Sequence, residues 1–377
     1  MLRVAAAGDQ GQAARSGADS ASDSAGLHQE FVPTDYTGGN PMDLTTRYLG
    51  LELKNPFVPS ASPLSRDLDT ARRLEDSGAS ALIMYSLFEE VVATETAPAY
   101  DAAHSPRLYS GGDAGVPEVH RDFPGELDRY LEQVAALKAT LEIPVIASLN
   151  GITLGSWIDR AREIGEAGAD AMELNVYYVA ADMDENSADV ERRYLDLLHE
   201  LRQHIDLPVN MKLSPFFSSL AHMARKLDEA GADGISLFNR FYQPDIDIDT
   251  LRLAPNLYPS ESHEALLEMR WIAILFGRTE MSLGATGGIL TPEDVVKLLL
   301  AGADVVHLCS ALLRHGPEHL TVLIDGLLAW MEQQEFEDLD LVRGRVSQMA
   351  VADPASFERT QYVNVLDTHS HRGSRRV

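Results

Sequence analysis

The sequence has very little cysteine: Cys309 is the single thiol among 377 residues. One thiol cannot build a disulfide framework, a CxxC zinc site or a four-cysteine iron–sulfur cluster within the chain, so these three kinds of site are excluded. A chain without internal disulfides fits a reducing compartment, and we expect a cytoplasmic protein.

Long apolar runs and positive charge are also scarce. No stretch approaches the ~20 apolar residues of a membrane-spanning helix, and the N-terminal residues lack the apolar centre of a signal peptide. The 31 basic residues are outnumbered by 58 acidic ones, which gives a formal net charge of -27. Because such a surface repels phosphate backbones and anionic lipids, we expect neither a nucleic-acid partner nor a membrane partner.

Large side chains are rare near the N-terminus. Residues 1–41 are rich in Ala, Gly, Ser and Asp and offer little to bury, which predicts a disordered extension. The whole chain is nevertheless 45% hydrophobic, enough for a large core. We expect one folded domain over residues 42–335 and a C-terminal extension over 336–377, with a short helix and a frayed tail.

The sequence does contain a repeated phrase. It reads "SGASALIM" at 77–84, "AGADAMEL" at 167–174, "AGADGISL" at 230–237 and "AGADVVHL" at 301–308. Each copy follows a helical pattern and runs into a short apolar stretch. Glycine can take the left-handed position that ends a helix, and alanine allows close packing as the chain turns into a buried strand.

Four further apolar stretches lie between these units, at 56–61, 143–150, 207–215 and 281–288. All of them are continuous apolar runs without alternation, as expected for parallel strands covered on both faces. Eight strand–helix units over about 290 residues predict an α/β fold of the (β/α)8 TIM-barrel type. A doubly wound open sheet is the alternative, and it is weaker because no glycine-rich nucleotide turn follows the first strand.

Polar residues interrupt the predicted strands near their ends. Chemistry in such a barrel gathers at the C-terminal ends of the strands. Asparagines and a lysine are found at four of these ends: Asn150, Asn175, Lys212 and Asn239. Because Asn and Lys are poor strand formers and costly to bury without partners, their recurrence at equivalent depths predicts a ligand site.

The last two predicted strands carry a pattern typical of phosphate binding. Gly287 and Gly288 come before a helix that Thr291 caps, and Ser310 opens another helix directly after the eighth strand. Backbone N–H groups at such turns can hold a dianion. Together with the amides and the lysine, this pattern favours a heterocycle joined to a phosphate, such as FMN.

Several of these stretches resemble the dihydroorotate dehydrogenase family of FMN barrels, over roughly residues 42–335. "LKNPFVPSAS" is similar to the opening of that family, "VNMKLSP" to its fifth strand, "GADGISLFN" to its sixth, and "GATGGI" and "VVHLCSALLRHGP" to its two phosphate-binding segments. The resemblance implies that the positions in contact with FMN are Ser60, Ala61, Ser62, Tyr85, Ser86, Asn150, Asn175, Lys212, Phe238, Gly287, Gly288, Cys309 and Ser310.

The same resemblance implies an activity. In the family a base removes the C5 proton of dihydroorotate and the C6 hydride passes to flavin N5, giving orotate in pyrimidine biosynthesis. Lys212 takes the position of the lysine beside flavin N1 and O2, and Asn175 and Asn239 take substrate-amide positions. The expected protein is therefore an FMN-dependent oxidoreductase acting on CH–CH bonds, with a dihydroorotate-like enoate as substrate and a homodimer as its assembly.

The chain also departs from the family pattern. "ELNVYYVA" aligns with Glu-Leu-Asn-x-Ser-Cys-Pro-Asn, so Asn175 matches, Tyr178 replaces the catalytic cysteine, and Ala180 replaces the second asparagine. The family's strand-two lysine is Tyr85 here, and its loop asparagine is not found in "DFPGELDRYL". Each substrate group left unpaired by such changes costs about 1–3 kcal/mol, so the identity of the substrate is open.

Tyr178 and Lys212 are the predicted catalytic residues. A tyrosine has an unperturbed pKa near 10. It can act as a base near neutral pH if Lys212 lowers that pKa, or as the acid that protonates a carbon in the reverse direction.

Two other functions stay open at this point. A phosphate-binding barrel without flavin, such as a lyase or isomerase with Lys212 as imine former, would use the same phosphate segments. A flavin-binding subunit without catalysis fits the missing base.

No metal site is expected, and the electron acceptor is open. His315 and His319 are four residues apart, but Pro317 interrupts the pair and no third ligand is evident. The lone cysteine rules out an internal iron–sulfur relay, so a soluble redox partner is the expected acceptor.

Overall fold

The computed structural model describes residues 42–90, 125–151, 157–254, 258–359, 362–363 and 365–366. The predicted disordered extension over residues 1–41 lies outside the described residues, and so does the predicted frayed tail from residue 367 onward.

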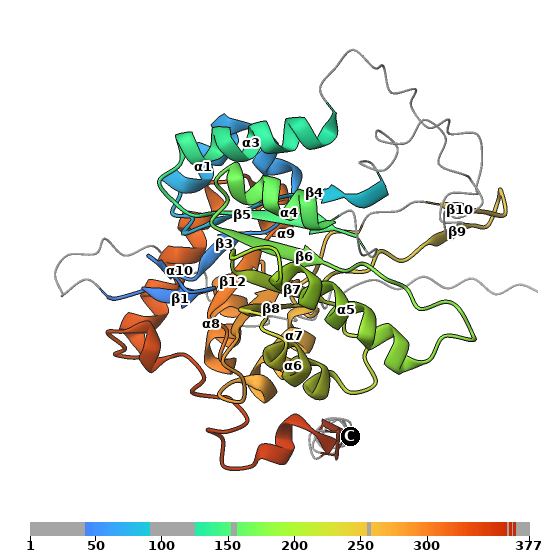
Figure 1. Cartoon of the computed structure of the whole chain (residues 1–377). Helices are drawn as coiled ribbons and strands as arrows, with labels where there is room; N and C mark the ends of the chain where they lie inside the picture. The colour runs from blue at the N-terminus through green and yellow to red at the C-terminus, as the bar shows by residue number, and fades with distance from the viewer. Residues whose placement is uncertain are drawn as a thin grey trace, which may run out of the picture. The chain divides into compact units, whose positions relative to one another are not determined.

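A parallel sheet forms the centre of the described structure (Figure 1). Over the described residues its eight strands are β3 (Phe57–Pro59), β4 (Leu82–Phe88), β5 (Val145–Asn150), β6 (Ala171–Asn175), β7 (Val209–Leu213), β8 (Gly234–Leu237), β11 (Ser282–Thr286) and β12 (Val305–Leu308). They are hydrogen-bonded in the order β3-β12-β11-β8-β7-β6-β5-β4. The consecutive strands β3 and β4 stand at the two ends of this order. The Ser80 amide and hydroxyl, just before β4, donate to the Phe57 carbonyl of β3 at 3.0 and 2.9 Å. The predicted (β/α)8 barrel is confirmed.

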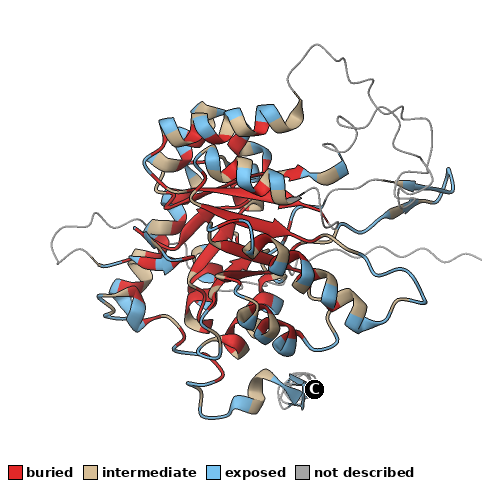
Figure 2. Cartoon of the chain, viewed as in Figure 1, coloured by how far each residue is buried: buried red, intermediate tan, exposed pale blue. Residues whose placement is uncertain are grey.

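Helices follow the strands and cover the outer face of the sheet (Figure 1). They are α1 (Leu68–Asp76), α3 (Glu126–Thr140), α4 (Trp157–Glu166), α5 (Ser187–Arg202), α6 (Leu220–Glu229), α7 (Ala265–Leu275), α8 (Pro292–Ala301), α9 (Ser310–His315) and α10 (His319–Gln333). In Figure 2 the strands of the central sheet are almost entirely buried, and the helices around them bury one side only. In α6 the buried residues are Leu220, Met223, Ala224 and Leu227, which is the spacing of a single apolar stripe.

The repeated phrase marks the turns from helix to strand. Gly302 of the fourth copy follows α8 with a φ of +122°, a conformation that favours glycine. A Cβ at this position would lie 2.3 Å from Cδ2 of Phe276. Both the backbone angle and the close packing therefore require glycine at this turn.

A hairpin that the sequence did not predict closes the N-terminal end of the barrel. It pairs β1 (Thr46–Tyr48) with β2 (Leu51–Leu53), and Leu49 in its turn donates from its amide to Ser282 Oγ at 3.0 Å. The hairpin packs on the lowest layer of inward-facing strand residues, which is apolar: Val58, Ala81, Ile83, Ile146, Ala171 and Val305. Apolar side chains thus fill the N-terminal end of the barrel. The polar residues that face the interior lie nearer the carboxyl ends of the strands.

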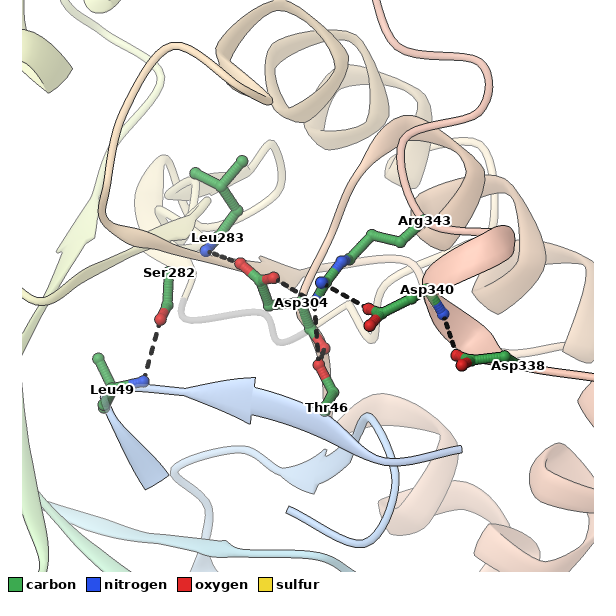
Figure 3. A network of polar contacts seen from close by, with 8 residues as sticks. All are labelled: Thr46, Leu49, Ser282, Leu283, Asp304, Asp338, Asp340 and Arg343. Atoms are coloured by element: carbon green, nitrogen blue, oxygen red, sulfur yellow. Dashed lines mark hydrogen bonds and ion pairs between the residues drawn. The ribbon is translucent and has the colours of Figure 1, made fainter. Parts of the chain in front are cut away.

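The residues after α10 pack against this same end (Figure 3). Arg343 donates to Asp304 Oδ1 and to Asp340 Oδ1, at 2.8 and 2.7 Å. The other oxygen of Asp304 accepts from the Leu283 amide at 2.7 Å, and its carbonyl accepts from Thr46 Oγ1 at 3.0 Å. One arginine therefore links the C-terminal segment to β1, β11 and the start of β12. In this segment the described residues form two short 3-10 helices, η2 (Leu339–Leu341) and η3 (Pro354–Phe357).

A second hairpin, also not predicted, follows β8. It pairs β9 (Asp245–Asp247) with β10 (Arg252–Ala254), and its apolar side chains Ile246, Leu251 and Leu253 are exposed. Where the helices are described, each is too short or too polar to cross a bilayer.

Gly326 allows α10 to approach α8. A Cβ at this residue would lie 2.2 Å from Cγ of Pro292, a rigid ring at the start of α8. We expect Gly326→Ala to lower the free energy of unfolding by about 1–3 kcal/mol through overpacking, even though alanine is the better helix former by about 1 kcal/mol. The free energy can be measured by urea denaturation.

The matched control is Gly165→Ala in α4. A Cβ there would meet Cδ1 of Leu207, the flexible end of a side chain, at 3.2 Å. We expect the free energy of unfolding to change by less than about 1 kcal/mol. Equal losses in the two variants would show that the contact with Pro292 does not limit the α8–α10 packing.

Candidate active site at the carboxyl ends of the strands

The register of the sheet places four polar residues in one row. Asn150 is the Cα partner of Asn175, Asn175 is the partner of Lys212, and Lys212 is the partner of Ser236. Residues paired in this way point to the same face of a sheet, which here is the barrel interior. Asn150 and Asn175 are the last residues of their strands, so the row lies at the carboxyl end of the barrel.

Lys212 forms an ion pair inside the barrel with Glu173, which lies two residues before Asn175 in β6. Its Nζ lies 3.2 Å from Glu173 Oε1, and the Glu173 side chain is fully buried. Asn210 donates from Nδ2 to Glu173 Oε2 at 3.1 Å and to Ser236 Oγ at 2.8 Å. Each oxygen of the buried carboxylate therefore has a partner, which is the condition for burying a charge.

His307 of β12 completes this polar layer. Its Nδ1 lies 3.3 Å from Ser236 Oγ, and its ring meets the edge of the Tyr48 ring with centroids 5.6 Å apart. Burial, and then the positive charge of Lys212, lower the pKa of His307 to about 3. His307 is therefore neutral, and the charges in this layer come from Glu173 and Lys212.

The two predicted substrate amides lie in direct contact. Asn239 follows β8 and donates from Nδ2 to Asn175 Oδ1 at 2.6 Å, and both side chains are buried. With the amide orientations assigned from this hydrogen bond, the pair still offers a donor on Asn175 and an acceptor on Asn239. That combination can bind a ligand group that carries both a carbonyl and an N–H.

The predicted phosphate-binding residues meet at one segment that leads into α7. Gly287 and Gly288 have φ angles of +123° and +63°. A Cβ on Gly288 would lie 2.6 Å from the amide nitrogen of Ala265, the first residue of α7. Ser310 Oγ accepts from the Ser260 amide at 3.1 Å in the same segment. We call Gly287, Gly288, Ser310 and the Ala265 amide the glycine cradle; its bare backbone and helix N-terminus suit an anion.

The other predicted flavin contacts lie at the ends of four strands, β3, β4, β8 and β12. Ser60 is buried after β3 and its amide donates to the Leu308 carbonyl at 2.8 Å, while Ser86 shares a hydrogen bond of 2.9 Å with Ser148. Ser62 and Phe238 are buried, and Ala61, Cys309 and Ser310 are half-buried. Burial raises the pKa of the Cys309 thiol, so Cys309 is a packed side chain and not a reactive thiolate.

The Tyr85 side chain does not join the row of polar residues that contains Lys212. The register between β4 and β5 shifts after Ile83, so that Met84 and Tyr85 together face one residue of β5. This bulge turns Tyr85 toward α3, where its ring meets the Tyr130 ring with centroids 5.1 Å apart. The guanidinium carbon of Arg66, from the segment before α1, lies 4.1 Å from the centroid of the Tyr85 ring. The Tyr85 side chain, which was predicted to contact the flavin, therefore lies on the helix side of the sheet, away from Lys212.

Tyr178 lies in the loop after β6 and has partners of its own. Its hydroxyl donates to Glu185 Oε2 at 2.5 Å, and Arg193 donates to the other oxygen of Glu185 at 2.6 Å. The Arg193 guanidinium also lies 4.3 Å above the tyrosine ring. The hydrogen bond to Glu185 is the main cause that raises the pKa of Tyr178. Lys212 is not among the causes of this shift, so the alternative in which Lys212 lowers the pKa of Tyr178 is wrong. Tyr178 holds its proton at neutral pH, and its role as an acid stays a prediction.

Sequence reasoning assigned no role to Glu173, Asn210 or Glu268. The first two repeat at a spacing of two with Asn175 and Lys212 in otherwise apolar strands, and this spacing is a usable signal because alternate strand residues share one face. Glu268 stands within the mostly apolar helix α7, and its side chain is 6% exposed. A carboxyl at a buried helix position is a weaker signal, because the helix pattern does not show what it faces.

The fold and this cluster define a (β/α)8-barrel protein with a polar site at the C-terminal ends of its strands. The family model described as dihydroorotate dehydrogenase matches residues 43–331. The chain belongs to the dihydroorotate dehydrogenase family.

Curated relatives cover most of the chain at low identity. The dihydroorotate dehydrogenase B (NAD(+)) catalytic subunit of Thermoplasma acidophilum is 27% identical over 302 residues, which are 79% of this chain and 96% of the relative. The dihydroorotate dehydrogenase A (fumarate) of Lactobacillus delbrueckii subsp. bulgaricus is 26% identical over 306 residues, 79% of this chain and 96% of the relative. The B-type catalytic subunit of Methanothermobacter thermautotrophicus is 24% identical over 307 residues, with shares of 80% and 97%.

Proposed function

We propose that this chain is an FMN-dependent oxidoreductase that acts on a CH–CH bond of a small unsaturated acid or amide. Dihydroorotate is the leading substrate, with a place in pyrimidine biosynthesis. The observation that carries the proposal is the row of Asn150, Asn175 and Lys212 at the barrel mouth, in a chain whose relatives are named dihydroorotate dehydrogenases.

The residues present fit FMN. An ammonium has three donors, and in the described part of the chain Lys212 has one hydrogen-bond partner, Glu173. A Cβ on Gly287 would lie 2.7 Å from Glu268 Oε1, and one on Gly288 would lie 2.6 Å from the Ala265 amide nitrogen, so close packing against α7 requires glycine at both positions. The backbone amides of this turn are the proposed phosphate donors. Ser60, Ser86, Asn150, Phe238 and Ser310 complete the proposed set around the ring and the phosphate. When bound, FMN supplies the hydride acceptor that no side chain can provide.

The charged and amide side chains have separate proposed roles. Lys212 supplies positive charge where negative charge develops during hydride transfer, and Glu173 holds the ammonium in place. The donor and acceptor left on the Asn175–Asn239 pair match the N–H and carbonyl groups of a cyclic amide such as dihydroorotate. These groups orient the substrate and account for the amide preference that we propose.

Tyr178 is the proposed proton carrier. Because Glu185 raises its pKa, Tyr178 suits the acid that protonates a carbon in the direction of substrate reduction. In the oxidation direction the phenol must first give its own proton to Glu185 Oε2, at 2.5 Å, and its oxygen then takes the proton from carbon. Glu185 and Arg193 hold the phenol in place for this transfer.

The direct test is the visible absorption spectrum of the purified protein. We expect a yellow protein that loses its absorption near neutral pH when dihydroorotate is added without oxygen. Protein that is colourless and stays colourless after incubation with FMN contradicts the proposal. Yellow protein that no dihydroorotate-like compound bleaches supports the flavin site but contradicts the oxidoreductase activity.

The names of the relatives suggest two acceptors to test, NAD(+) and fumarate. After bleaching, each compound is added separately without oxygen, and the return of the yellow colour identifies the acceptor. We propose a soluble acceptor in the cytoplasm and a homodimeric assembly, and light scattering of the purified protein measures the assembly.

One observation favours a second candidate, a flavin-binding subunit without catalysis. Tyr178 replaces the family's cysteine, and its hydroxyl is engaged with Glu185. The unbleached yellow protein described above is the outcome that this candidate predicts. A lyase that forms an imine on Lys212 is less well supported, because the ion pair with Glu173 suits a charged ammonium and not a neutral amine.

A further inference from the structure

Glu268 is a buried carboxyl that the proposed hydride transfer does not use. It lies in the first turns of α7, its side chain is 6% exposed, and within the described residues its Oε2 has no hydrogen-bond partner. It lines a cavity of about 630 Å³ together with Gly287, Asn239 and Phe238. A buried carboxyl without a partner is costly as an anion, so its place in a ligand cavity needs an explanation.

The carboxyl lies against the glycine cradle. A Cβ on Gly287 would be 2.7 Å from Glu268 Oε1, so the side chain fills the space beside that glycine. Gly288 faces the Ala265 amide at the N-terminus of α7, where the helix dipole favours a negative charge. The cradle therefore offers one anion-binding position and already has a carboxyl next to it.

The charged groups around Glu268 do not neutralise it. Arg240, Asp245, His263 and Glu264 line the same cavity, and Arg270 lies on α7 itself. Of the elements packed on α7, α8 carries Glu293, Asp294 and Lys297, β8 and β11 carry no titratable residue, and Glu358 beside η3 accepts from Gln348 at 2.9 Å. Arg240 is paired with Glu264 at 3.3 Å, and Asp294 accepts from Ser262 Oγ at 2.7 Å. Across the described residues no cation is paired with Glu268. Burial, aided by the nearby Glu264 charge, raises its pKa to about 8.

We infer that the glycine cradle takes up a phosphate dianion only together with a proton on Glu268. The proton comes from solvent and stays on the carboxyl, which then donates a hydrogen bond where an ionised carboxylate would repel the phosphate. Glu268 is thus a specificity-determining residue that couples phosphate binding to pH. This inference rests on the proposed FMN site and adds a requirement that the family resemblance does not contain.

The test is the dissociation constant of FMN between pH 7 and pH 9.5, measured by flavin fluorescence on protein freed of flavin. In this range the phosphate itself is already a dianion, since its second pKa is about 6. One proton taken up on binding makes the dissociation constant rise about tenfold per pH unit above the pKa of the carboxyl, near 8. Riboflavin, which has the same ring and no phosphate, should bind with little change over this range.

Glu268→Gln keeps the size of the side chain and removes the titration. We expect its dissociation constant for FMN to be nearly flat with pH, and to be lower than that of the wild type at pH 9.5 by tenfold or more. The matched control is Glu261→Gln on the same segment, because Glu261 is exposed and paired with Arg314 at 2.7 Å; it should keep the slope of the wild type.

The outcomes separate this inference from the proposed function. FMN binding that is flat with pH in the wild type, or a slope in Glu268→Gln equal to that of the wild type, overturns the role of Glu268 and leaves the flavin site intact. A slope that riboflavin shares assigns the effect to the ring and also overturns it. No binding of FMN at any pH overturns the proposed function, and this inference with it.

Discussion

Replacing Lys212 with methionine should lower the free energy of unfolding by about 3–5 kcal/mol, because it leaves the Glu173 carboxylate buried without its ion-pair partner. Both side chains are inside the barrel, with exposed fractions of 8% for Lys212 and 0% for Glu173, so water cannot replace the lost partner. Denaturation in urea or guanidinium measures the change. The same variant should lose FMN, because the proposed flavin contact is removed.

A second substitution separates the structural role from the functional role. Lys212→Met/Glu173→Gln removes both charges and keeps an oxygen that accepts from Asn210. We expect this double variant to recover most of the lost stability, since replacing both members of a buried ion pair is often nearly neutral. FMN retention should not recover, because no ammonium is restored.

The matched control is an ion pair near the surface. Lys226 pairs with Glu191 at 3.1 Å, and their side chains are 33% and 11% exposed. Lys226→Met should cost less than about 1 kcal/mol. A loss in Lys212→Met as small as that of the control, or a double variant no more stable than the single one, contradicts the view that Glu173 depends on Lys212.

The barrel could be predicted because its signals are local. In the repeated phrase a helix pattern, a glycine and an apolar stretch follow one another within a few residues, and each feature has its own physical cause. The hairpin β1–β2 could not be predicted, because its turn lacks the residue pair that usually marks a two-residue hairpin turn. Leu49 and Gly50 both have positive φ angles, of 53° and 76°, where Asn-Gly or Asp-Gly is the expected pair. Leucine is used at this position because its side chain is buried at the bottom of the barrel.

The part of the candidate site that lies on the strands could be predicted, because alternate residues of a strand share one face. Asn150, Asn175 and Lys212 interrupt apolar strands near their ends, and register then brings them into one row. The orientation of Tyr85 could not be predicted, because a bulge in β4 turns it toward α3 and no residue pattern announces the bulge. The position of Glu268 depends on how α7 packs on the glycines after β11, which is a tertiary contact without a local signal.

Tyr178→Phe should slow the proposed redox half-reaction by a factor of about 10² to 10⁴, the usual contribution of a positioned acid or base. The substitution removes the hydroxyl that donates to Glu185 and keeps the ring that packs under Arg193. The rate is measured by stopped-flow absorption, as orotate restores the yellow colour to protein that dihydroorotate has bleached. FMN content should be unchanged, because Tyr178 is not among the residues proposed to hold the cofactor.

The neighbouring tyrosine provides the control for Tyr178. Tyr177 stacks on Phe241 with ring centroids 4.2 Å apart, and its hydroxyl accepts from the Tyr242 amide at 3.2 Å. Tyr177→Phe should therefore keep the rate within a few-fold of the wild type. A normal rate in Tyr178→Phe would remove Tyr178 from the chemistry and favour the flavin-binding subunit without catalysis.

Glu185→Gln tests whether the carboxylate sets the proton affinity of Tyr178. The hydrogen bond to Glu185 raises the pKa of Tyr178 above its usual value of 10, so its loss lowers that pKa. An acid is active while it holds its proton, and its contribution falls as pH rises through its pKa. The alkaline limb of the rate profile should therefore move to lower pH in Glu185→Gln than in the wild type. A limb at the same pH in both proteins would mean that another group delivers the proton, whatever the effect of Tyr178→Phe on the rate.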